Sequence, residues 1–192
     1  MIRKICLFLL VLFFSVGTAI GIAGDKEVLG VKFADEKTVA GKTLKLNGVA
    51  YRKALGFIKV YAGGFYLENP TKDPAQAIES EQVKHFYLHY LTSKATAKKI
   101  REGFVELMEK CNPPELVQKH RADIDRHAAW FDADMKPGQT SVTTYIPGKG
   151  LVVEYMGSVK GTIADPEYAH MYYRYIFGDK ANQKMKKGYL GL

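Results

Sequence analysis

The segment from Phe57 to Leu67 constrains the fold of this chain more than any other. Nearly every position in it is aliphatic, aromatic or glycine, and Lys59 carries its single charge. Aromatic and β-branched residues favour extended structure, and a strand that is apolar at successive positions is covered on both faces. The pattern therefore predicts a strand in the interior of a sheet.

An arginine and a tyrosine near this strand form a candidate anion clamp. Arg52 follows the glycine-containing run at residues 46–51, and Tyr61 lies on the strand itself. Guanidinium and phenol donors together suit a carboxylate or an enolate. An interval of nine residues would place the two on opposite faces of one continuous strand, so they converge only if residues 53–56 form a turn, which Gly56 permits. The alternative for Arg52 is a surface ion pair with an acidic residue.

Residues 1–23 have the pattern of an export signal. A short basic start precedes an apolar run over residues 5–16, and Gly21 and Ala23 provide small residues for cleavage. The apolar run is shorter than the about 20 residues of a bilayer span, so an uncleaved anchor helix is the less favoured alternative. We therefore expect an exported protein, periplasmic or secreted, with one domain formed by residues 24–192.

Charge and cysteine content narrow the possible partners. Only Cys111 remains after the predicted cleavage, so an intramolecular disulfide is impossible, and its place in a helical apolar pattern favours a buried, inert thiol. The formal net charge of +8 favours an anionic ligand or an anionic membrane surface. Nucleic acid is not expected, because the chain has no recognised nucleic-acid motif and carries an export signal. The sequence leaves the oligomeric state open.

One histidine pair offers possible metal ligands. His85 and His89 lie four residues apart on a predicted strand over residues 83–91, and therefore on the same face. No acid or cysteine has the spacing needed to complete a site around them. We therefore predict neither a metal nor another cofactor.

The order of the predicted elements indicates an α+β domain. Strands are predicted over residues 42–46, 57–67 and 83–91. A helix capped by Thr92 or Ser93 follows and stops at residues 112–114, and a second helix then has on one face Leu116, His120, Ile124, Ala128 and Phe131. A hairpin over residues 141–156 and a helix from Asp165-Pro166 to Gly178 complete the order. Strands interrupted by paired helices favour an antiparallel sheet with the helices gathered on one side.

Several of these segments, taken in order, resemble the chalcone isomerase family. Residues 48–52 are similar to the glycine-rich approach to its catalytic arginine, and residues 57–67 to the strand that follows. Further similarities lie in the late hairpin (141–151), the end of the cleft helix (107–111) and the closing helix-glycine turn (177–180). The resemblance extends from about Gly41 to the C-terminus. It implies an open-faced sandwich with a ligand between an antiparallel sheet and a layer of helices.

The resemblance also allows a comparison with the catalytic members of the family. The plant enzymes close a flavanone ring by intramolecular attack of a phenolate on an enone, with an arginine that matches Arg52. Their threonine position is occupied here by Tyr61, their asparagine by Lys110 and their helix tyrosine by Gly103. These departures weaken the isomerase reading, in which Arg52 would be the catalytic residue.

Non-catalytic, fatty-acid-binding members of the family pair the arginine with a tyrosine at the position of Tyr61, where both contact the ligand carboxylate. The resemblance therefore implies a small hydrophobic carboxylate or phenolic ligand, held by Arg52 and Tyr61 with Lys110 as a further cation. The residues expected to shield its apolar part are Phe57, Phe65, Phe104 and Tyr172. Isomerisation is the first alternative, and an exported interaction protein with a vestigial cleft is the second.

Overall fold

A seven-stranded antiparallel sheet forms the centre of the molecule. The computed structural model describes residues 25–192, so the predicted signal of residues 1–23 lies outside the described part. Each strand of the sheet pairs with its neighbours in sequence, in the order β3-β4-β5-β6-β7-β8-β9. These strands are β3 (Glu36–Val39), β4 (Lys42–Ala54), β5 (Ile58–Leu67), β6 (Lys84–Tyr90), β7 (Thr140–Ile146), β8 (Gly150–Tyr155) and β9 (Ser158–Ile163). A separate hairpin consists of β1 (Lys26–Val28) and β2 (Val31–Phe33).

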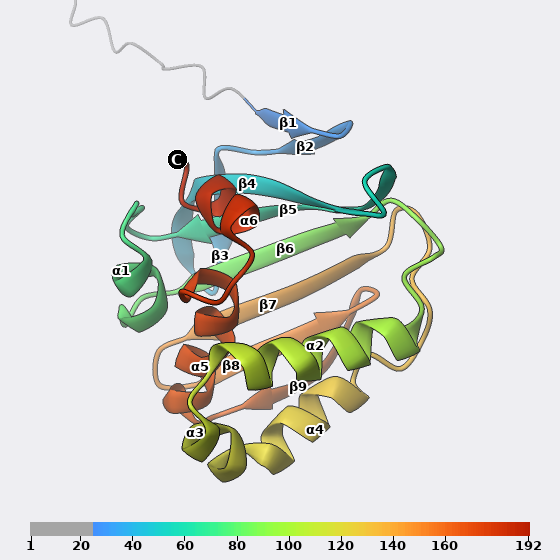
Figure 1. The fold of residues 1–192 in the computed structure, drawn as a ribbon. Helices are drawn as coiled ribbons and strands as arrows, with labels where there is room; N and C mark the ends of the chain where they lie inside the picture. Colours follow the sequence, from blue (N-terminus) through green and yellow to red (C-terminus); the bar gives the residue numbers. More distant parts are fainter. Residues whose placement is uncertain (1–24) are drawn as a thin grey trace, which may run out of the picture.

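Six helices are present in the described part of the chain. They are α1 (Pro74–Glu79), α2 (Ala97–Cys111), α3 (Pro114–Lys119), α4 (Arg121–Ala129), α5 (Pro166–Phe177) and α6 (Gln183–Tyr189). Helix α5 packs on β8, α2 packs on α5 and α4, and α6 packs on β4 at the other end of the sheet (Figure 1). Between residues 25 and 192, no helix is long and apolar enough to span a bilayer. The predicted α+β open-faced sandwich is confirmed.

Local capping explains where the helices begin and end. The Asp165 side chain accepts a hydrogen bond from the backbone N–H of Glu167, and α5 ends at Gly178, as the sequence predicts. The prediction for α2 is wrong at its start, because Thr96 rather than Thr92 or Ser93 caps it through the backbone N–H of Lys99.

The predicted second helix is divided into two at His120. This residue has φ −102° and ψ 19°, outside helical geometry. Its Nε2 atom lies 2.6 Å from the Glu167 carboxylate on α5, so a contact distant in sequence holds the break in place. Ile124 and Ala128 are nevertheless buried, as their spacing predicts.

Both faces of the central strand β5 are covered. Phe65 packs against Phe86 and Phe177 on the side of the helices, with ring centroids 6.0 and 4.9 Å apart. Phe33 of β2 is buried on the opposite side, where it lies beside Gly64. This arrangement confirms the interior strand, which begins at Ile58, one residue after the predicted start.

Candidate anion-binding cavity

The hairpin between β4 and β5 brings Arg52 and Tyr61 together. The two residues are direct partners in the antiparallel register, and their side chains therefore share one face. The turn consists of Leu55, Gly56 and Phe57, with φ values of 49° and 76° at the first two. It lies later than the predicted turn over residues 53–56, because β4 continues through Ala54, and a register shift between Arg52 and Lys53 places Arg52 opposite Tyr61.

A partly enclosed cavity of about 210 Å³ lies next to this pair, between the hairpin and helices α2, α5 and α6. Its cations are Arg52 and Lys110, which the sequence singles out, and Lys180. Its hydroxyl groups come from Tyr61, Tyr175 and Tyr189, and apolar side chains of α2, α5 and α6 complete the wall. The hairpin and the ends of three helices thus converge on one small space.

The cavity carries a positive charge that nothing in its wall balances. No carboxylate lines it, and within residues 25–192 none of its three cations is in an ion pair. Burial raises the pKa of Tyr61, against the opposing effect of Arg52, and burial also raises the pKa of Tyr175 and Tyr189. The phenols therefore stay protonated and can donate hydrogen bonds at neutral pH. This combination suits an anion.

The hydroxyl of Tyr189 is a further polar group in the wall. It is buried and has no hydrogen-bond partner among the described residues. Gly63 makes room for it, because a Cβ atom at that position would lie 2.5 Å from the hydroxyl oxygen. An unpaired buried hydroxyl costs about 1–3 kcal/mol, and an acceptor within the cavity would remove this cost.

The four aromatic residues expected to shield the ligand lie outside the lining of this cavity. Phe57 is 73% exposed in the turn before β5, because the strand starts one residue later than expected. Phe65 belongs to the core beneath the cavity, and Phe104 packs against His127 and Phe131. The Tyr172 hydroxyl accepts a hydrogen bond from Thr143 at 2.7 Å, which turns it toward the sheet.

Three of the residues that line the cavity, Tyr175, Lys180 and Tyr189, were not identified from the sequence. Tyr175 lies three positions after the predicted lining residue Tyr172 on α5, and that helix is buried around most of its circumference, so periodicity does not identify Tyr175. Tyr189 lies in a short glycine-containing helix with no apolar period to indicate its orientation. Lys180 belongs to the helix-glycine turn, which is recognisable in the sequence, but nothing local indicates that it points toward a cavity.

His85, one of the two histidines considered as metal ligands, has another partner. His85 Nδ1 lies 2.9 Å from Thr144 Oγ1, and the ring packs on Tyr66. Within the described residues, the group with metal-like spacing is instead His120, Asp165 and Glu167. Its atoms are otherwise engaged, because Lys119 pairs with Glu167 and Asp165 caps α5.

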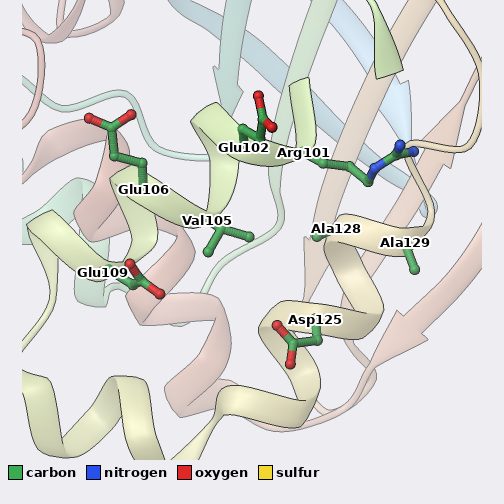
Figure 2. A pocket seen from close by; sticks show the side chains of 8 residues that line it. All are labelled: Arg101, Glu102, Val105, Glu106, Glu109, Asp125, Ala128 and Ala129. Atoms are coloured by element: carbon green, nitrogen blue, oxygen red, sulfur yellow. The ribbon is translucent and has the colours of Figure 1, made fainter. Parts of the chain in front are cut away.

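A larger and more open hollow of about 520 Å³ lies between α2 and α4 (Figure 2). Its polar wall is mainly acidic, with Glu102, Glu106, Glu109 and Asp125. Arg121 forms ion pairs with Glu109 and Asp125, so much of this charge is already balanced on the surface. An acidic open groove does not suit an anionic ligand, and the cavity beside Arg52 and Tyr61 is the better candidate site.

Comparison with known proteins identifies the family. The model of chalcone isomerase-like proteins matches residues 25–191, and the chain belongs to that family. A crystal structure of a fatty-acid binding protein from Arabidopsis thaliana has a TM-score of 0.67 to this structure, with 16% sequence identity, over 87% of this chain and 96% of that chain. At this identity the similarity shows a common fold. No curated protein matches the chain.

Proposed function

We propose that this protein binds a small hydrophobic carboxylate, such as a fatty acid, in the cavity beside Arg52 and Tyr61. The observation that carries the proposal is the direct pairing of these two residues at the mouth of a cavity that contains no acidic side chain. The Arg52 guanidinium and the Tyr61 phenol would each donate a hydrogen bond to the carboxylate, and the Tyr189 hydroxyl would donate another. The fold shared with a plant fatty-acid binding protein is consistent with this reading.

The volume of the cavity limits the size of the ligand. Its volume of about 210 Å³ lies below the range of roughly 300–1,000 Å³ of typical ligand pockets. Leu107, Ile176 and Met185 form its apolar wall, and each methylene buried there would contribute about 0.8 kcal/mol. We therefore favour an acid with a short or medium-length chain.

Replacing Arg52 by alanine should weaken the binding of decanoic acid about 10- to 100-fold, because a hydrogen bond to a charged group contributes about 1.5–3 kcal/mol. The fold should persist, since Arg52 is exposed and has no ion pair among residues 25–192. Isothermal titration gives the affinity, and native mass spectrometry of the purified protein shows whether an acid of fatty-acyl mass co-purifies. Arg126→Ala, which removes the same charge from α4, is the matched control and should leave the affinity unchanged.

Equal affinity of the Arg52→Ala variant and the unmodified chain would contradict the proposal. So would the absence of a bound acid from both, together with no heat of binding for decanoic acid. Turnover of a chalcone-like enone by the unmodified chain, lost in Arg52→Ala, would instead establish the isomerase alternative. If the Arg52→Ala variant still bound every partner of the unmodified chain, the interaction-protein alternative would be favoured.

We also propose that the protein is exported and that residues 1–23 are removed. The support is the basic start, the apolar run and the small residues before Gly24. Intact-mass measurement of the protein recovered from the exporting compartment should give a chain that begins at Gly24. Recovery of the uncleaved chain from the membrane fraction would instead indicate an anchor.

A further inference from the structure

The tip of the β4–β5 hairpin exposes two large apolar side chains. Leu55 is 80% exposed and Phe57 is 73% exposed, and only Gly56 separates them. Neither residue lines the candidate cavity, so the proposed ligand does not explain them. The tip of the hairpin lies at one end of the sheet, at the right in Figure 1.

Leu55 also has an unfavourable backbone conformation. Leu55 has φ 49°, a left-handed conformation that a bulky side chain adopts at a cost. Met156 has the same geometry, with φ 56°, but it packs against the core. Leu55 gains no comparable packing from residues 25–192, and asparagine, aspartate or glycine would suit its place in the turn better.

Two lysines near the tip of the hairpin also repel each other. Lys53 and Lys59 are direct partners across the two strands, and both are exposed. Like charges directly opposite each other destabilise a strand pair. The hairpin contains no acidic residue between Lys42 and Leu67 to offset them. Lys184 of α6 adds a further cation beside Tyr51, with its Nζ 3.3 Å from the phenol oxygen.

We propose that this hairpin tip docks on an anionic lipid bilayer, with Leu55 and Phe57 inserted among the acyl chains and Lys53 and Lys59 at the headgroups. An anionic surface complements the paired lysines, and the acyl region removes both apolar side chains from water. The tip thus acquires at the bilayer the packing and the counter-charge that the described residues do not provide.

Docking in this way would place the cavity at the membrane surface. Arg52 and Tyr61 lie on the same hairpin, and their pair is next to the Lys53–Lys59 pair in the register of the two strands. A hydrophobic acid partitions into the bilayer, so a cavity held there would meet its ligand at the lipid surface. The membrane contact itself does not depend on ligand binding, because the inserted residues lie outside the cavity wall.

Depth-dependent fluorescence quenching tests the insertion in the full chain. A Phe57→Trp variant should be quenched by brominated acyl chains in phosphatidylglycerol vesicles. A Val159→Trp variant is the matched control, since Val159 is 67% exposed at the start of β9, and it should show only the background of Trp130. Both variants keep residues 1–24, so any membrane contact of that segment is common to the two. Equal quenching of both variants, or quenching of neither, would overturn the proposal.

Vesicle sedimentation separates the apolar and the electrostatic contributions. Leu55→Ser with Phe57→Ser should lower partition into anionic vesicles about tenfold or more, and Lys53→Gln with Lys59→Gln should do so to a similar degree. Equal partition into phosphatidylcholine vesicles would contradict the role of charge. The serine variant should retain its affinity for decanoic acid, so failure of the membrane proposal and failure of the ligand proposal are distinguishable.

Discussion

Replacing Gly48 by alanine should lower the free energy of unfolding by about 2–4 kcal/mol, one of the largest effects expected of a single methyl group in this protein. A Cβ atom at this position would lie 2.2 Å from the backbone oxygen of Gly188 and 2.6 Å from that of Tyr189. Both obstacles are backbone atoms, so no side-chain rotation can relieve the clash. The end of α6 must therefore move away from β4.

The same displacement should weaken ligand binding, because α6 contributes Met185 and Tyr189 to the cavity wall. Asn47 would lose the hydrogen bond of 2.8 Å that its side chain donates to the carbonyl of Tyr189. Urea denaturation measures the loss of stability, and titration with decanoic acid measures the loss of affinity. The structural account of Gly48 would fail if the denaturation midpoint stayed within error of that of the unmodified chain.

Gly103→Ala is the matched control for this experiment. Gly103 lies inside α2, and a Cβ atom there would have no neighbour within 4 Å. Alanine loses less backbone entropy than glycine on folding, so the variant should be more stable by about 0.5–1 kcal/mol. The same chemical change should thus have opposite effects at two positions, according to the space that surrounds the new atom.

The second large effect expected is a loss of stability in mild acid. Burial lowers the pKa of His127 to about 3, and burial, with a smaller effect of Lys37, lowers the pKa of His85 to about 4. An unfolded histidine takes up a proton near pH 6.5, whereas these two remain neutral while the protein is folded. Their contribution to stability is therefore complete above pH 6.5 and is lost as the pH falls toward 4 and 3. Between pH 7 and pH 5 the loss should be about 2 kcal/mol for each histidine.

Urea denaturation at pH 7 and pH 5 tests this expectation. His127→Phe should remove about half of the difference between the two pH values, because phenylalanine fills the space beside Phe104 and Phe131 without titrating. Tyr168→Phe is the control, since it removes the hydroxyl 2.9 Å from His127 Nδ1 but leaves the imidazole in place. An unchanged pH dependence in His127→Phe would exclude this histidine as the cause.

Much of the fold follows from short-range patterns. The helix from Pro166 to Phe177 was predictable because its capping aspartate, first-turn proline and terminal glycine all lie within or next to the helix. The hairpin of β7 and β8 follows from the turn residues Pro147-Gly148-Lys149-Gly150 between two runs rich in β-branched and aromatic residues. The break at His120 was not predictable, because it depends on Glu167 in another helix.

Part of the candidate site was likewise predictable from the sequence, and part was not. Arg52, Tyr61 and Lys110 were identifiable from the resemblance of their segments to a known family, and the structure brings all three to one cavity. The aromatic lining was not, because α5 is buried on most sides and its spacing does not distinguish Tyr172 from Tyr175. Tyr189 reaches the cavity only because α6 docks against Gly48 and Gly63, far away in the sequence.

The sequence by itself determined the fold class, the interior strand β5 and the possibility that Arg52 and Tyr61 meet. These features depend on side-chain period, turn residues and caps, which act within a few residues of one another. The tertiary structure alone decided which side chains enclose the cavity, which histidines lose access to water and which apolar side chains stay outside. Those outcomes depend on the packing of segments that are distant along the chain, and no local pattern records that packing.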